Sequence, residues 1–198
     1  IRIPQWLAEY AFEGDVRHVT VAVDGLAQTV DSVENLKNAF RKAGRIEMGD
    51  GDNSFSIIDL PDMLENVWID RPSVPSTEIY RLPDEVAGES RQSRLQWLRD
   101  FIDENNCSAM LVTALDEIVW LLNVRASDVA YNPVALSYLL VTWDKAVWYV
   151  DKAGEKSPVT AETYAELEED GVEIRSYDAV FEELASPEAL NFTALYVD

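Results

Sequence analysis

The chain has 198 residues, of which 47% are hydrophobic and 27% charged, a composition typical of a folded globular protein. Its 37 acidic and 16 basic residues give a formal net charge of −21, which would repel phosphate backbones and anionic membrane surfaces. The most apolar run, residues 133–150, is interrupted by Asp144 and Lys145 and is shorter than the roughly 20 residues of a membrane span. We therefore expect no nucleic-acid and no membrane partner. A single cysteine, Cys107, excludes an internal disulfide and favours a cytoplasmic location.

The first 70 residues predict several helices but only one clear strand. Helices are expected at Pro4–Phe12, from Asp31 or Ser32 to Gly44, and at Leu60–Trp68; the strand is His18–Asp24, and Asp50–Ser56 reads as a polar loop. Because one strand does not make a sheet, residues 1–70 are predicted to be the C-terminal part of a first domain that is not self-contained. Residues 71–89 carry Pro72, Pro75 and Pro83 with little periodicity, and they are predicted to be a linker.

Residues 90–198 predict a second domain in which strands and helices alternate. Helices are expected at Ser90–Glu104, from near Ala114, at Thr160–Asp170 and at Asp178–Ala185; strands are expected at Ala109–Val112, Ser137–Trp143, Ala146–Val150, Val172–Ser176 and Thr193–Val197. The unbroken apolar character of the central hairpin indicates strands that are covered on both faces. The fold class is therefore α/β, with a mixed central sheet flanked by helices.

The most informative stretch runs from Thr113 to Trp143. One buried helix face is predicted by the i, i+3, i+4, i+7 spacing of Leu115, Ile118, Val119 and Leu122. Thr113 and Asp116 have the spacing of a capping box at the helix start. Asn123, which tolerates a left-handed backbone, is expected to end the helix.

A polar loop follows this helix, and Pro133 closes it. Its candidate domain-interface or substrate-cleft residues are Arg125, Asp128, Tyr131 and Asn132. Two interpretations remain open: Arg125 and Asp128 form a surface ion pair of little consequence, or the loop faces a partner or substrate, since scaffolds place recognition groups on such loops. Tyr131 could equally serve packing. Trp68 and Arg71 flank the linker and are candidates for clamping the two domains together.

The segment TALDEIVWLLNVRASDVAYNP, residues 113–133, resembles the middle domain of three-domain Xaa-Pro aminopeptidases (aminopeptidase P), which are metallopeptidases. The run VWIDRP, residues 67–72, stands upstream at the spacing that this family shows. The resemblance covers nearly the whole chain and implies a creatinase/aminopeptidase N-terminal-like fold. One departure is Ala126, where the family has glycine: either φ is negative at this residue or the loop differs.

By this resemblance, the chain is a non-catalytic N-terminal fragment whose parent releases the N-terminal residue from peptides with proline in second position. The catalytic domain, with a dinuclear Mn or Zn centre, is absent from the sequence. The implied partners are that catalytic domain, the peptide substrate and a second copy in a homodimer. The alternatives are a stand-alone binding or interaction module of the same fold, and part of a creatinase/prolidase-type hydrolase.

No catalytic or metal-ligating residue is assigned within the chain. His18 is the single histidine, and no sequence motif places a serine near it. The acidic run from Asp50 to Asn53 fails the EF-hand template, because Phe55 and Pro61 occupy the positions of the required glycine and glutamate. We therefore expect no cofactor in this fragment.

Overall fold

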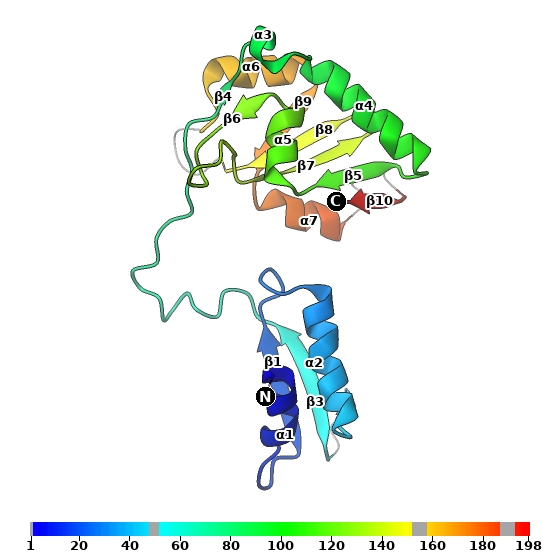
Figure 1. The fold of residues 1–198 in the computed structure, drawn as a ribbon. Helices are drawn as coiled ribbons and strands as arrows, with labels where there is room; N and C mark the ends of the chain where they lie inside the picture. The colour runs from blue at the N-terminus through cyan, green and yellow to red at the C-terminus, as the bar shows by residue number, and fades with distance from the viewer. Residues whose placement is uncertain (1, 48–51, 152–157, 187–192) are drawn as a thin grey trace. The chain divides into compact units, whose positions relative to one another are not determined.

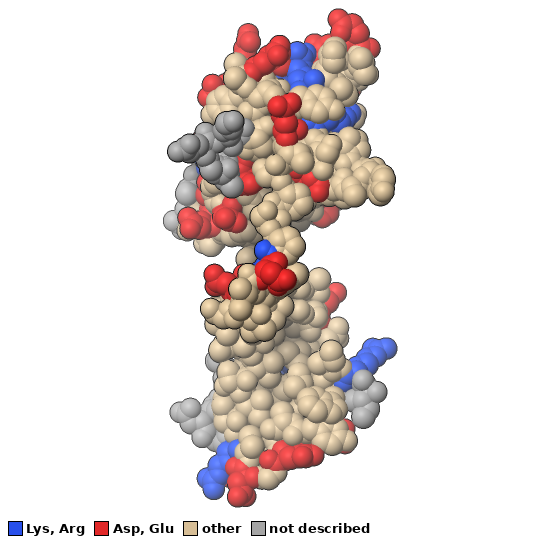
Figure 2. All heavy atoms as spheres, turned by 90° about the vertical axis from the view of Figure 1, so that its left-hand side faces the viewer, with Lys and Arg blue, Asp and Glu red and all other residues tan. Residues whose placement is uncertain are grey.

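A computed structural model describes residues 2–47, 52–151, 158–186 and 193–198. The chain divides into two compact units, Ile1–Pro72 and Ser73–Asp198 (Figure 1). Each unit has a hydrophobic core of its own. Acidic side chains are spread over both units in the view of Figure 2, as the net charge of −21 requires.

The first unit is a small parallel sheet whose two helices pack with it around one hydrophobic core. Its elements are α1 (Ile3–Tyr10), β1 (His18–Val23), α2 (Val30–Lys42), β2 (Ile46–Glu47) and β3 (Ser54–Asp59). The strand order is β1-β3-β2, and both pairings are parallel. Phe40 and Phe55 are fully buried at the centre of the core, with their ring centroids 4.7 Å apart. This unit therefore forms a sheet, which the sequence analysis did not expect.

Two predictions for this unit were wrong. Residues expected to form the end of a polar loop belong to β3, in which buried Phe55 and partly buried Ile57 alternate with serines. The helix predicted over Leu60–Trp68 is a series of turns. Asp62 has a left-handed φ of 46°, and its N–H donates to the Asp24 carboxylate over 3.1 Å, so a helix cannot continue through this residue.

The second unit is built on a five-stranded mixed sheet of order β10-β5-β7-β8-β9 (Figure 1). Its strands are β5 (Ala109–Val112), β7 (Ser137–Thr142), β8 (Ala146–Val150), β9 (Val172–Ser176) and β10 (Leu195–Val197). Only β7 runs antiparallel to its neighbours. The predicted hairpin, α/β class and mixed sheet are confirmed.

Helices cover both faces of this sheet. The elements α4 (Arg91–Glu104), α5 (Leu115–Leu121) and α6 (Ala161–Glu169) pack on one face, and α7 (Ala179–Ala185) packs on the other (Figure 1). Successive residues of β7 face opposite cores: Leu139 and Val141 lie under α4 and α5, whereas Leu140 lies with Val180 of α7. Every residue of β8 is buried, which agrees with the prediction of strands covered on both faces.

The stretch predicted to be a linker contains two elements of the second unit. They are β4 (Tyr80–Arg81) and α3 (Asp84–Ala87), and β4 pairs antiparallel with β6 (Val124–Arg125). A two-residue strand has no periodicity that a sequence could reveal. The stretch predicted to be a linker, residues 71–89, therefore contains secondary structure from Tyr80 to Ala87.

The predicted capping box at the start of α5 does not form. The Thr113 hydroxyl donates instead to Asp198 Oδ1 over 2.8 Å, and Asp198 also accepts from the Thr113 N–H over 2.7 Å. A residue 85 positions later in the chain therefore replaces the local cap. The other end of α5 is as predicted, since Asn123 is left-handed with a φ of 52°.

Candidate functional site

The polar loop between β6 and β7 is fixed to the rest of its unit by one carboxylate. Asp128 Oδ1 accepts hydrogen bonds from the Thr77 N–H (2.8 Å) and from the Thr77 hydroxyl (2.7 Å), and its Oδ2 accepts from the Leu136 N–H (2.9 Å). The Thr77 hydroxyl oxygen in turn accepts from the Ser127 N–H at 2.8 Å. Asp128 therefore joins both ends of the loop to the chain segment that precedes β4. Thr77 was missed because it lies in the predicted linker.

Tyr131 stands at the tip of this loop. The Asn132 N–H donates to the Val129 carbonyl over 3.1 Å, which closes a tight turn with Tyr131 inside it. Tyr131 has a φ of 65°, a conformation that costs a residue with a Cβ about 1–2 kcal/mol. Its side chain is fully exposed, at 107% of the reference area. The idea that Tyr131 serves packing is therefore wrong: a rigid base presents a strained aromatic residue to solvent.

The rest of the loop lies close to its base. The Asn132 carbonyl accepts from the Val134 N–H over 2.9 Å, and Asn132 itself is exposed. Ala126, the departure from the family pattern, is 2% exposed and is not among the residues with positive φ. A glycine is therefore not required at this position.

Arg125 is bonded to backbone carbonyls and not to Asp128. Its Nη1 donates to the Val119 carbonyl (3.0 Å) and to the Val124 carbonyl (2.7 Å). No ion pair in the described part of the chain joins Arg125 to Asp128. Arg125 thus helps to cap the C-terminal end of α5, and its side chain remains partly exposed at the loop base.

Two further arginines, which the sequence analysis did not single out, cap the same helix end. Arg94 donates to the Trp120 carbonyl, and Arg91 Nε donates to the Leu122 carbonyl over 2.7 Å. Cations at a helix C-terminus are favourable because the unpaired carbonyls and the helix dipole give that end a partial negative charge. These arginines therefore stabilise the helix end that leads through β6 into the loop.

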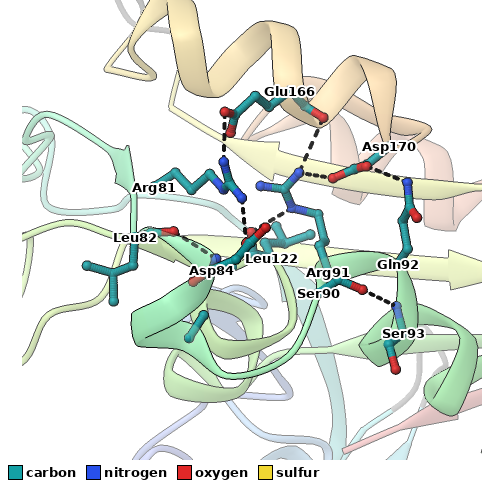
Figure 3. Close-up of polar contacts among 12 residues, drawn as sticks. Arg81, Leu82, Asp84, Ser90, Arg91, Gln92, Ser93, Leu122, Glu166 and Asp170 are labelled. Atoms are coloured by element: carbon teal, nitrogen blue, oxygen red, sulfur yellow. Dashed lines mark hydrogen bonds and ion pairs between the residues drawn. The ribbon is translucent and has the colours of Figure 1, made fainter.

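Arg91 is buried and belongs to a polar network at the start of α4 whose other members are partly or fully exposed (Figure 3). Its Nη1 pairs with Asp170, whose other oxygen accepts from Gln92 Nε2 over 2.8 Å. Arg81 Nη1 donates to Glu166 Oε1 over 2.8 Å. Burial lowers the pKa of the Arg91 guanidinium, and the charge of Asp170 opposes that effect. The charges of this network pair with one another, so we assign it a structural role that connects β4, α4 and α6.

The linker-clamp candidates contact each other within the first unit. Arg71 Nη1 donates to both carboxylate oxygens of Asp62 at 2.8 Å, and its guanidinium lies 5.7 Å from the ring centroid of Trp68. These contacts account for Arg71 without a partner in the second unit. A clamp between the two domains stays a prediction.

His18 has serine neighbours that the sequence did not reveal. Parallel pairing of β1 with β3 places Ser54 Oγ 2.7 Å from His18 Nδ1 and Ser56 Oγ 3.1 Å from Nε2. No sequence motif placed a serine near His18, whereas the sheet does. Both ring nitrogens are engaged by hydroxyl groups of the sheet, and no carboxylate orients the ring in these contacts. His18 is therefore assigned to the polar face of the sheet.

A dinuclear metal centre does not fit the residues that the structure describes. Among them, no group of three or more His, Cys, Asp or Glu side chains could hold a metal ion. Asp50 and Gly51 of the acidic run lie outside the described residues. In the same described ranges, no helix is long and apolar enough to span a membrane.

Residues 70–198 match the family model of the creatinase/prolidase N-terminal domain, and this match covers most of the chain. The chain belongs to this family. The match includes all of the second unit, and thus the Asp128 loop, the capped end of α5 and the five-stranded sheet. The recognition of the family from residues 67–72 and 113–133 is confirmed.

Curated relatives of this family member are fungal proteins named probable Xaa-Pro aminopeptidase P. The one from Pyricularia oryzae is 33% identical over 180 residues, and the one from Colletotrichum graminicola is 34% identical over 183 residues. The alignments cover 90% and 91% of this chain but only 26% and 27% of the relatives. The chain therefore spans about a quarter of the length of the relatives it matches.

A solved structure has the same fold. The X-prolyl aminopeptidase from Caenorhabditis elegans, described as a cytosolic enzyme with a di-nuclear active site, superposes with a TM-score of 0.72 at 24% identity. The superposition covers 96% of this chain and 29% of that enzyme. Both units therefore have counterparts in one larger protein.

Proposed function

We propose that this chain is a non-catalytic N-terminal part of a cytoplasmic, metal-dependent Xaa-Pro aminopeptidase. In this proposal, the parent enzyme releases the N-terminal residue from peptides with proline in second position. The residues described here contact the catalytic domain and restrict access to it. The dinuclear Mn or Zn centre would activate water and polarise the scissile carbonyl, and it would be held by the rest of the parent chain.

The presentation of Tyr131 is the observation that carries this proposal. A fully exposed aromatic side chain in a left-handed turn gains nothing within its own unit, and it adds backbone strain. Strain of this kind persists where the surrounding structure fixes it, and it is concentrated at functional sites. Large aromatic residues are also the most common anchors of protein interfaces. Tyr131 is therefore proposed to anchor the loop on the catalytic domain, at or beside the substrate cleft.

The neighbouring residues have distinct roles in this proposal. Asp128 fixes the position of the turn relative to the rest of the unit, so that the loop does not lose conformational entropy when it contacts the catalytic domain. Arg125 fixes the base of the loop through its Nη1, and since the residue is partly exposed, we propose that its other donors bind a carboxylate or carbonyl of the catalytic domain. A rigid loop beside the cleft excludes long or folded peptides and leaves short peptides able to enter.

The proposal is tested in the full-length enzyme with a pair of matched variants. Tyr131→Asn removes the ring and retains a residue that tolerates positive φ, so the fragment should keep its stability. Trp143→Ser removes another exposed aromatic residue, 71% exposed, from the turn of the β7–β8 hairpin. We expect Tyr131→Asn to lower kcat/KM by about tenfold, equivalent to about 1.4 kcal/mol, and Trp143→Ser to leave it unchanged.

Wild-type kinetics for Tyr131→Asn, measured with short and with longer Xaa-Pro peptides, would contradict the role of the loop. A gene that stops directly after Asp198 would favour the stand-alone interaction module instead. Continuation into a region with two Asp, one His and two Glu ligands would favour the peptidase.

A further inference from the structure

A groove on the second unit is lined by side chains from α4, α5, β5 and β10 (Figure 1). It has a volume of about 360 Å³, at the lower end of the range of small-molecule sites. Buried Met110 and Val112 of β5 are part of its lining. Its aromatic lining residues are Trp97 and Phe101 of α4, Trp120 of α5 and Tyr196 of β10. The groove is thus mainly aromatic and large enough for a small organic group.

The four rings form an aromatic box and not a flat stack. Trp97 and Phe101 form one wall, with their ring centroids 6.3 Å apart and their planes inclined by 25°. Trp120 stands at 87° to Trp97, over a centroid distance of 6.4 Å. Tyr196 stands at 84° to Phe101, over 5.5 Å. Solvent reaches three of these rings, which are 58% (Trp97), 42% (Trp120) and 38% (Tyr196) exposed. The groove is therefore bounded by aromatic surfaces in perpendicular orientations.

The charged side chains of the groove are acidic. Glu117 and Asp198 line it, whereas no lysine, arginine or histidine among the described residues does. The Asp198 carboxylate accepts from two backbone N–H groups at the start of α5, and the Glu117 carboxylate has no hydrogen-bond or ion-pair partner in the described part of the chain. The guanidinium of Arg94 lies 4.6 Å from the centroid of the Trp120 ring, but Arg94 is buried and does not line the groove. The two carboxylates therefore give the lining a negative charge.

We propose that this aromatic box binds a small quaternary ammonium ligand. The methyl groups of such a cation pack against the rings, and the ring quadrupoles attract its positive charge. The carboxylates of Glu117 and Asp198 add attraction of the same sign. A divalent metal ion is a poorer match because it requires several oxygen ligands, and both carboxylates would repel an anion. A neutral apolar group would leave the charge of the lining unused.

The charge of the ligand provides the first test. Choline and its uncharged carbon isostere, in which a tert-butyl group replaces the trimethylammonium group, have the same shape. In calorimetric titrations we expect choline to bind with a dissociation constant of about 1 mM or lower. The isostere should bind at least about tenfold more weakly, because it lacks the cation. In NMR spectra, choline should shift the indole N–H signals of Trp97 and Trp120 but not that of Trp143, which is exposed in the turn of the β7–β8 hairpin.

Glu117→Gln tests the free carboxylate against a matched control. This substitution keeps the shape of the side chain and removes its charge, so choline should bind about three- to tenfold more weakly and the isostere as before. Asp116→Asn removes a charge from the same first turn of α5, but Asp116 does not line the groove. It should change choline affinity by less than about twofold, because solvent and salt screen an exposed charge. Trp97→Leu removes an exposed ring and should weaken choline binding at least about fivefold.

Equal binding of choline and the isostere would overturn the proposal, because the groove would then recognise apolar surface alone. Absence of choline binding at about 10 mM, or Glu117→Gln binding choline as well as Asp116→Asn, would also overturn it. The titrations are repeated on the complete gene product, in which choline should bind with the same affinity. Loss of binding there would mean that the rest of the protein occupies the groove, which is incompatible with a ligand site. None of these outcomes depends on the peptidase assignment.

Discussion

Replacing Asp128 by alanine should release the loop that carries Tyr131. The substitution removes the acceptor of three hydrogen bonds, and it leaves the N–H groups of Thr77 and Leu136 without their partner. Hydrogen bonds to a charged group contribute about 1.5–3 kcal/mol each when buried. Because Asp128 is only half-buried, water replaces part of that loss. We therefore expect the free energy of unfolding of the second unit to fall by about 2–4 kcal/mol.

Urea denaturation and amide exchange together measure this effect. Exchange at the Leu136 amide should accelerate in Asp128→Ala, since its acceptor is gone. Ser127→Ala is the matched control. Ser127 is exposed and is bonded through its backbone N–H, which the substitution keeps, so the free energy of unfolding of the second unit should change by less than about 0.5 kcal/mol. A double-mutant cycle with Thr77→Val should give a coupling energy of at least about 0.5 kcal/mol.

The reasoning would be refuted if Asp128→Ala matched the Ser127→Ala control. It would also be refuted if the effects of Thr77→Val and Asp128→Ala were additive, because the pair then would not interact. In the full-length enzyme, Asp128→Ala should lower kcat/KM in the same direction as Tyr131→Asn.

Three further predictions concern the two units. Arg91→Ala should lower the free energy of unfolding of the second unit by about 3–5 kcal/mol, because the buried guanidinium pairs with Asp170. In thermal unfolding, Arg91→Met should lower it less, because methionine retains most of the side-chain volume. Burial and a hydrogen bond to Glu183 raise the pKa of Tyr149 well above its usual value, so the folded chain keeps a proton that the unfolded chain loses above about pH 10. The contribution of Tyr149 to the free energy of unfolding is therefore fully present below pH 10 and is lost as the pH rises above it. Above pH 10, this free energy should fall more steeply in wild type than in Tyr149→Phe, by up to about 1.4 kcal/mol per pH unit. Equal pH dependence of the two proteins in urea denaturation would contradict this. Amides of β1 should exchange faster than those of β8 in dilute protein, because β1 is a half-exposed edge and β8 is wholly buried; equal protection there would show that the first unit is covered.

The sequence by itself determined those elements that are long enough to show a periodic pattern of apolar residues. The helix at Arg91–Glu104 has its buried residues Leu95, Leu98 and Ile102 at helical spacing, and the structure buries all three. The hairpin of β7 and β8 was visible because a run that is apolar on both faces of a strand has no other place than the centre of a sheet. Two motifs, at residues 67–72 and 113–133, were sufficient to identify the family.

Short strands were decided only by the tertiary structure. β2, β4 and β6 have two residues each, and a strand of that length exists only because a partner strand lies beside it. β3 was missed for another reason: its serines face the polar side of the sheet, so its alternation resembled a loop until Phe55 was seen in the core.

The candidate site shows the same division. Its residue types were visible in the sequence, because a loop crowded with polar side chains between buried elements indicates recognition. Their partners were not visible, because Asp128 bonds to Thr77, 51 positions away, and Thr113 to Asp198, 85 positions away. A carboxylate can accept from any donor within reach, and only the folded backbone determines which donors those are. The exposure of Tyr131 likewise required the structure, since a sequence does not reveal toward which side a tight turn points.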